Sequence, residues 1–325
     1  MRTPEAVPTA APAASPQPRA TLPLFTANDL LWLVYFYPIC WLAKILPRSL
    51  LYAIGKLVDP IVQFHLRDRK EKVVPWIAEA CGVTAGRARE IARRSLTNNL
   101  FGALDDLLLL RPSPESMLCC LGVEGRHHLE SAIARGKGVI LLVGHFFASR
   151  ITLRYLAKIG YGTLSVRNRQ PSNAAEGRLG RRFVRARRSE VQQRVLPDHV
   201  FIQDSECTLK IMRRLRAGGL AVIQMDGRAG TNPLEYSFLR KRRHLASGIF
   251  EIVRLSDCAV LPMLCLGRGD GFRIRFEPAL EIVPSTSREA FVCANLPQFA
   301  AVLERHIIAN PEEWRLWNPY LAWRV

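Results

Sequence analysis

The chain has 325 residues, 49% of them hydrophobic, and a formal net charge of +18 at pH 7. This composition excludes an intrinsically disordered protein, and the length allows one large hydrophobic core or two smaller ones. The charge, carried mostly by arginine, favours polyanionic partners, which are phosphate groups, an anionic membrane surface or nucleic acid.

Residues 1–28 are predicted to form a flexible tail. The stretch before Thr26 is rich in Pro and Ala and shows no apolar period. No function is inferred from this segment.

Residues 29–66 are predicted to be a helical segment that anchors the chain to a membrane. Residues 30–46 are nearly all apolar and contain several Trp and Tyr residues, a run at the lower edge of what spans a bilayer, and Pro38 is expected to kink it. Asp29 and the lack of a cleavage motif argue against a signal peptide. An ordinary buried core helix is the alternative, but interfacial aromatic residues favour a membrane anchor or hairpin.

Residues 67–325 are predicted to be one α/β domain that opens with a helical region over residues 67–111. Beyond the breaker "RPSPESM", apolar runs alternate with helical stretches, which is typical of a mainly parallel sheet. "GFRIRFEPALEI" alternates and predicts additional strands at the sheet edge. The expected strands cover residues 139–143, 163–166, 200–203, 220–225 and 259–266, and the expected helices cover 207–217 and 246–255.

No metal site and no cofactor are predicted. The eight cysteines show neither a C-x-x-C motif nor a Cys/His spacing typical of zinc, so we expect buried thiols in a reducing compartment. No G-x-G-x-x-G or Walker loop follows any of the expected strands.

His145 follows the apolar run "VILLVG" and Asp226 follows "LAVIQM". Ligands of such sheets gather beyond the carboxyl ends of the strands, and the basic runs at 177–188 and 240–243 could hold an anion there. A neutral histidine beside arginines is suited to deprotonating a hydroxyl while the cations bind an anionic acceptor. The alternatives without a function are that His145 is only a capped loop residue, that Asp226 is only a turn residue, and that the basic runs are solvent-exposed helix faces.

Four blocks of the sequence, "VEGRHHLESAIARGKGVILLVGHF", "GLAVIQMDGRAG", "FLRKRRHLASGIFEIVRLSDCAVLPML" and "NPEEWRLW", resemble successive blocks of the bacterial lipid A late acyltransferase family. This family is the lauroyl/myristoyl branch of the lysophospholipid acyltransferase superfamily. The resemblance implies a glycerolphosphate-acyltransferase-like mixed α/β sheet flanked by helices. It also implies a membrane-bound O-acyltransferase on the cytoplasmic face of the inner membrane. The donor would be acyl carrier protein or acyl-coenzyme A, and the acceptor a hydroxyl or amine of an anionic lipid or glycolipid.

The defining motif of that family is a histidine followed by four residues and then an acid. The histidine matches His145, but Arg150 occupies the acid position. An arginine neither orients the imidazole nor offsets its charge, and by analogy with a serine protease triad the loss could cost about 10⁴ in rate. Either Asp226 serves instead, or the protein is a non-catalytic lipid-binding or partner protein.

The resemblance also implies roles for other residues. Asp226 matches the family's aspartate after the equivalent strand, Arg167 matches an arginine at the end of the second strand, and either Arg182 or Arg185 matches an arginine further on. We therefore expect Arg150, Arg167, Arg182 and Arg185 to bind substrate. Nucleic acid is not an expected partner, because the sequence contains no finger, RNP pattern or recognition helix.

Overall fold

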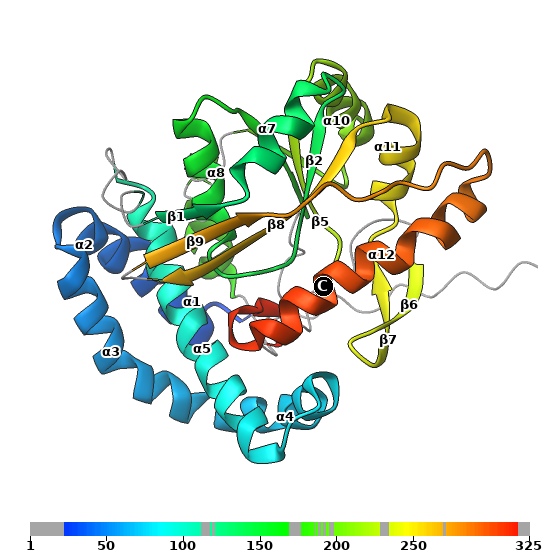
Figure 1. The fold of residues 1–325 in the computed structure, drawn as a ribbon. Helices are drawn as coiled ribbons and strands as arrows, with labels where there is room; N and C mark the ends of the chain where they lie inside the picture. The colour runs from blue at the N-terminus through cyan, green and yellow to red at the C-terminus, as the bar shows by residue number, and fades with distance from the viewer. Residues whose placement is uncertain are drawn as a thin grey trace, which may run out of the picture.

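The α/β architecture is confirmed by the computed structural model, which places helices on both faces of a seven-stranded sheet (Figure 1). Arg185 lies outside the described residues, so its expected role stays untested. The structure describes residues 23–111, 118, 121–168, 177–184, 186–187, 190, 193–194, 198–227, 234–268 and 271–317.

The sheet is mainly parallel, as predicted, with strand order β1-β9-β8-β2-β5-β3-β4. Strands β8, β2, β5, β3 and β4 run in one direction, β9 is antiparallel to β8, and β1 is parallel to β9. A separate antiparallel pair is formed by β6 and β7. The strand bounds are β1 Leu121–Glu124, β2 Val139–Val143, β3 Thr163–Arg167, β4 His199–Phe201, β5 Leu220–Gln224, β6 Leu234–Phe238, β7 Lys241–Leu245, β8 Ala259–Arg268 and β9 Gly271–Phe276.

The prediction of an edge position for "GFRIRFEPALEI" is wrong. Its first half is β9, which lies between β8 and the edge strand β1, and its second half, residues 277–282, is not a strand. Pro278 explains where the strand ends, because proline has no N–H to donate to the ladder. Strand β1 was missed because its four residues are too short a run to show a period.

The helices differ widely in length, and from β1 onward they are interspersed with the strands along the chain. The helix bounds are α1 Ala27–Val34, η1 Tyr35–Ile39, α2 Cys40–Ile45, α3 Arg48–His65, α4 Arg67–Cys81, α5 Ala85–Leu108, α7 Arg126–Ala134, α8 Ser149–Lys158, η2 Gly180–Val184, α10 Cys207–Arg216, α11 Gly248–Ser256, α12 Arg288–Ala309, η3 Pro311–Glu313 and η4 Arg315–Trp317.

Two hydrophobic clusters cover the two faces of the sheet. Alternate residues of β2 point to opposite sides: Ile140 and Leu142 pack with α4, α10, α11 and α12, whereas Leu141 and Val143 pack with α2, α7 and α8. Helix α5 contributes its first half to one cluster and its second half to the other. We call these the α12 face and the α8 face of the sheet.

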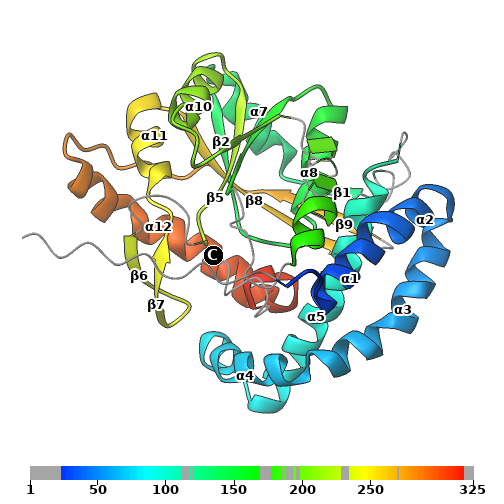
Figure 2. The same ribbon diagram turned by 180° about the vertical axis from the view of Figure 1, so that it is seen from behind.

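The N-terminal helices form an arm along α5 at one side of the sheet (Figures 1 and 2). Pro38 lies inside the π-helical turn η1, which separates α1 from α2. Phe36, Cys40 and Ala43 of this segment are buried, whereas Trp41 is 62% exposed. The segment is therefore amphipathic and not a fully buried core helix. Among the described residues, no helix is both long and apolar enough to cross a membrane.

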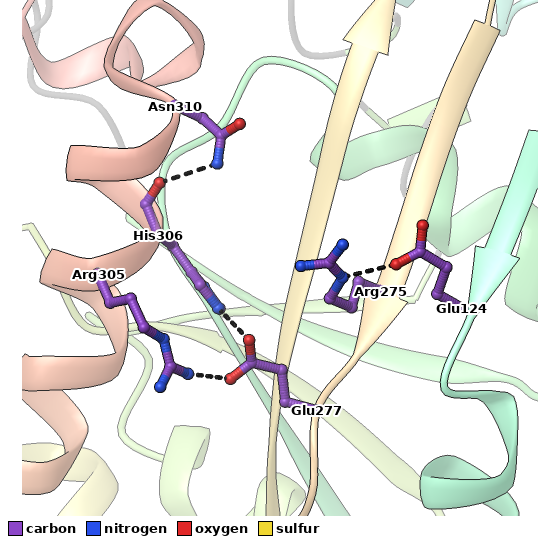
Figure 3. A network of polar contacts seen from close by, with 6 residues as sticks. All are labelled: Glu124, Arg275, Glu277, Arg305, His306 and Asn310. Atoms are coloured by element: carbon purple, nitrogen blue, oxygen red, sulfur yellow. Dashed lines mark hydrogen bonds and ion pairs between the residues drawn. The ribbon is translucent and has the colours of Figure 1, made fainter.

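Helix α12 is attached to the end of β9 by a polar network (Figure 3). His306 Nε2 lies 2.8 Å from Glu277 Oε1, and Arg305 forms an ion pair with the other oxygen of Glu277. His306 is only 4% exposed, and its Nδ1 is buried without a hydrogen bond inside the described part of the chain. Arg275 forms a separate ion pair with Glu124.

The prediction of buried thiols holds for Cys40, Cys207, Cys258 and Cys265, and burial raises the pKa of Cys265 to about 12. It is wrong for Cys293, which is exposed. Cys293 lies on the outer side of α12, between Phe291 and Asn295, which face inward.

Candidate active site

His145 and Asp226 meet at the carboxyl ends of neighbouring strands. Strands β2 and β5 pair with Val143 opposite Gln224, and each site residue lies two positions beyond that pair. The Nδ1 of His145 is 2.6 Å from Oδ1 of Asp226, and the backbone N–H of His145 donates to Oδ2 at 2.8 Å. The structure therefore brings together the two residues that the sequence predicted as catalytic.

Asp226 is a buried carboxylate with a complete set of donors. It is 1% exposed, and the indole N–H of Trp314 donates to its Oδ2 at 2.7 Å. Burial raises the pKa of Asp226, but the charge and hydrogen bonds of His145 together with the bond from Trp314 outweigh it and lower the pKa below its ordinary value. Asp226 is therefore ionised at neutral pH.

The ionised carboxylate determines which nitrogen of His145 is available for chemistry. Nδ1 donates its proton to Asp226, so Nε2 carries the lone pair. The His145 side chain is 24% exposed, and its Nε2 accepts no hydrogen bond from any residue that the structure describes. This is the arrangement of a general base with an orienting carboxylate.

The segment that contains Trp314 and Arg315 packs against this site. Phe146 and Trp314 form an antiparallel bridge, and the backbone N–H of Arg315 donates to the carbonyl of His145 at 2.8 Å. A Cβ at Gly144 would lie 2.7 Å from the Phe146 ring and 3.3 Å from Oδ2 of Asp226. Glycine is therefore required between β2 and His145, because a side chain would displace the ring or the carboxylate.

Arg150, at the first turn of α8, forms an ion pair with Asp106 of α5. Burial raises the pKa of Asp106, and the positive charges of Arg150, Arg315 and Arg167 oppose this rise. One carboxylate thus contacts Arg150 and lies within electrostatic range of two further guanidinium groups, those of Arg315 and Arg167. The motif position that carries an acid in the family therefore faces an acid here.

The remaining expected substrate-binding arginines lie in different places. Arg167 ends β3, with its guanidinium carbon 5.9 Å from the Phe201 ring centre. Arg182 is exposed on η2. The segment that contains η2 is joined to α1, because the backbone N–H of Gly177 donates to the carboxylate of Asp29. Among the described residues Arg182 contacts neither His145 nor Asp106, so the structure does not bring it to the site.

Sequence reasoning missed Asp106, Trp314 and Arg315 as parts of the site. Asp106 belongs to the helical run "ALDDLLLL" and has no local mark of function. Trp314 and Arg315 lie in "NPEEWRLW", which the resemblance included without giving those two residues a role. Within the described ranges, no three His, Cys, Asp or Glu side chains are grouped so that they could hold a metal ion.

Residues 22–320 match the sequence profile of the family described as bacterial lipid A biosynthesis acyltransferase. The chain belongs to this family. Membership indicates an acyltransferase that acts on lipids in lipid A biosynthesis, in agreement with the resemblance seen in the sequence. A search of curated proteins found no match.

Proposed function

We propose that the protein is a membrane-associated acyltransferase that moves a fatty acyl group from acyl carrier protein or coenzyme A to a hydroxyl or amine of an anionic lipid or glycolipid. The observation that carries this proposal is the bond from His145 Nδ1 to ionised Asp226, with Nε2 left open. Asp226 supplies the carboxylate that Arg150 does not. The departure from the family motif is therefore compatible with catalysis.

The proposed reaction begins when His145 Nε2 removes the proton of the acceptor hydroxyl. The hydroxyl oxygen attacks the thioester carbonyl carbon and forms a tetrahedral intermediate. The C–S bond then breaks, and the leaving thiolate takes the proton back from the imidazolium. Asp226 stabilises the imidazolium while it exists. An ester and a free thiol leave, and His145 is neutral again.

The cluster around Asp106 is the proposed binding site for the anionic group of the acceptor. The positive charges of Arg150, Arg167 and Arg315 all act on Asp106, and Arg315 is bonded through its backbone to His145. An arginine donates bidentate hydrogen bonds that match phosphate. Asp106 holds Arg150 in position for such a contact.

The proposed membrane-binding surface consists of exposed apolar side chains on the N-terminal arm and at η2 with the residue before it. It includes a hollow of about 350 Å³ lined by Leu33, Val34, Tyr37, Pro38 and Phe183. A patch of this kind on a basic protein suits an anionic lipid surface, and we propose the cytoplasmic face of the inner membrane. The exposed apolar side chains of this surface are Leu30, Val34, Tyr37, Trp41, Ile45, Leu50, Leu57, Val58, Ile61, Phe64, Leu179 and Phe183.

The test is mass spectrometry of membrane lipids from cells that express the wild-type chain or His145→Ala. We expect a lipid heavier by one acyl group that appears with the wild type and not with the variant. Arg126→Ala, whose side chain pairs with exposed Glu130, is the matched control and should retain the product. A wild type without any new acylated lipid would favour a non-catalytic lipid-binding protein.

A further inference from the structure

Arg243 lies on β7, next to the candidate active site but on the α12 face. The strand that carries it is joined to the end of β5, because the backbone N–H of Ala246 donates to the carbonyl of Met225 at 3.3 Å. Met225 directly precedes Asp226. The negative charge of Asp226 raises the pKa of Arg243, whereas burial, the larger effect, lowers it. The hairpin thus places a half-buried guanidinium within electrostatic range of the catalytic carboxylate.

The Arg243 guanidinium contacts an aromatic cluster that reaches Asp226. Its central carbon is 4.4 Å from the ring centre of Trp76. Trp76 packs against Trp314 with ring centres 5.7 Å apart, and Trp314 donates to Asp226. Contact with an aromatic ring fixes a guanidinium through cation–π attraction and leaves its N–H groups available for hydrogen bonding.

Those N–H groups form no hydrogen bond or ion pair with any residue that the structure describes. The neighbouring Arg242 faces away and pairs with Glu235 at 3.4 Å. The stretch of sequence between Gly227 and Leu234 contains no Asp or Glu. A half-buried arginine that has lost part of its hydration and has no carboxylate partner among the described residues is suited to receive an anion.

Two cationic groups therefore flank His145 from opposite faces of the sheet. The Asp106 cluster lies with α5 and α8 on the α8 face, and Arg243 lies with Trp76 and Trp314 on the α12 face. An acyl transfer from a pantetheine thioester to a phosphorylated acceptor brings at least one phosphate on each substrate. The acceptor phosphate is assigned to the cluster of three arginines, which leaves Arg243 for the donor.

We propose that Arg243 binds the phosphate of the donor's phosphopantetheine arm and so directs the thioester toward His145. The proposal rests on the proposed function, because it takes a pantetheine thioester as the acyl donor. The Trp76 ring packs against the Arg243 guanidinium, and the N–H groups of the guanidinium donate to the phosphate oxygens. Lysine would supply the charge without the paired donors, so Arg243→Lys should retain only part of the affinity.

The test is calorimetric binding to the full-length protein in detergent, with two pairs of probes. The donor pair is 4′-phosphopantetheine and pantetheine, which differ by the phosphate. The acceptor pair is glucosamine 1-phosphate and glucosamine. We expect the wild type to prefer the phosphorylated member of each pair. Arg243→Ala should reduce the preference for 4′-phosphopantetheine by about tenfold or more, the usual effect of losing a charged hydrogen bond, and leave the preference for glucosamine 1-phosphate unchanged.

Arg242→Ala is the matched control on the same strand and should keep both preferences. Arg150→Ala should reduce only the preference within the acceptor pair. The proposal is overturned if Arg243→Ala keeps the full donor preference, if Arg242→Ala loses it equally, or if Arg243→Ala affects the acceptor pair instead. Melting temperatures of all variants, with Arg243→Lys included, distinguish lost binding from lost folding.

Because these measurements require no turnover, they separate the two proposals. A protein that binds 4′-phosphopantetheine through Arg243 but transfers no acyl group would contradict the proposed function and support the phosphate site. If the protein transfers acyl groups and Arg243→Ala leaves the donor KM unchanged, the proposed function is supported and the phosphate site is contradicted.

Discussion

Two histidine–carboxylate pairs of similar geometry occur in the described part of the chain, and they have opposite surroundings. His145 bonds Asp226 at 2.6 Å and His306 bonds Glu277 at 2.8 Å. In the first pair the carboxylate is buried and the histidine is partly exposed. In the second pair, which joins α12 to the end of β9 (Figure 3), the histidine is buried and its Nδ1 has no hydrogen-bond partner in the described part of the chain.

The difference shows that a carboxylate partner alone does not make a histidine a base. Burial lowers the pKa of His306, Glu277 raises it, and Arg305 and Arg275 add to the lowering. His306 is therefore neutral at pH 7, but no substrate reaches its Nδ1. His145 has the same partner type and an accessible Nε2, so access to the second nitrogen separates the proposed catalytic pair from the buried one.

The largest expected effect is the loss of acyl transfer when the histidine of the first pair is replaced by glutamine. The same substitution in the second pair provides the comparison. His145→Gln should reduce acyl transfer to background, because the described residues place no other histidine beside Asp226, with a melting temperature near that of the wild type. His306→Gln should leave the rate within about twofold and lower the melting temperature, because it changes a buried side chain. Rates and melting curves of both variants check this. Wild-type turnover in His145→Gln would remove the distinction between the pairs.

The second largest effect is expected when the carboxylates are replaced by amides. Asp226→Asn should lower the rate by about 10⁴, in analogy with the triad aspartate. The amide does not offset the imidazolium charge, and its NH₂ group would oppose the donors of Trp314 and His145. Glu277→Gln should leave the rate unchanged. Single-turnover rates of the two variants make the comparison, and equal losses would mean that both pairs act in catalysis.

The third prediction concerns Arg150, which lies in the acid position of the family motif. Arg150→Glu should destabilise the fold by about 3 kcal/mol, because it sets a carboxylate against Asp106 in a half-buried contact. The double variant Arg150→Glu with Asp106→Arg should regain most of that loss. Urea unfolding measures both. A higher transfer rate in Arg150→Glu than in the wild type would instead identify a decayed enzyme that lacks its motif acid.

The smallest effect is a pH dependence of stability that distinguishes the pairs. The folded-state pKa of His306 is lowered from 6.5, so the unfolded chain binds a proton first and stability falls as the pH drops below about 6.5. The pKa of Asp226 is lowered from 3.8, so its contribution is lost only in more acidic solution. Melting temperatures between pH 7.5 and 5.5 should fall less in His306→Gln than in the wild type. An equal slope would assign the decrease to other groups.

Much of the fold could be predicted from the sequence because its central strands are continuous apolar runs. Strand β2 and helix α10 were predicted within one residue of their observed ends. The β6–β7 hairpin was not predicted, because its turn residues Leu239 and Arg240 have positive φ angles that are normally the mark of Asn or Gly. The order of the strands was also out of reach, because it depends on pairing between distant segments.

The site was predictable to the extent that it lies at strand ends. His145 and Asp226 stood out as polar residues after apolar runs. Their contact depends on β2 and β5 being neighbours in register, which no local pattern encodes. Asp106 is brought to Arg150 by the packing of α5 across the sheet, and Trp314 by the return of the chain after α12. The arginine at the position of the motif acid could not be explained from the sequence. Its explanation needs the contact of Arg150 with Asp106 and the contact of His145 with Asp226.

The bridge between Phe146 and Trp314 has a consequence for biogenesis. A ribosome releases the chain from the N-terminus, and domains begin to fold during synthesis. The segments of His145 and Asp226 emerge well before Trp314, so the nascent sheet holds the carboxylate without its indole donor and without the segment that forms the bridge to Phe146. The proposed active site is thus completed only after Trp314 has been synthesised, and chains that end before Trp314 are expected to be inactive even where the sheet has formed.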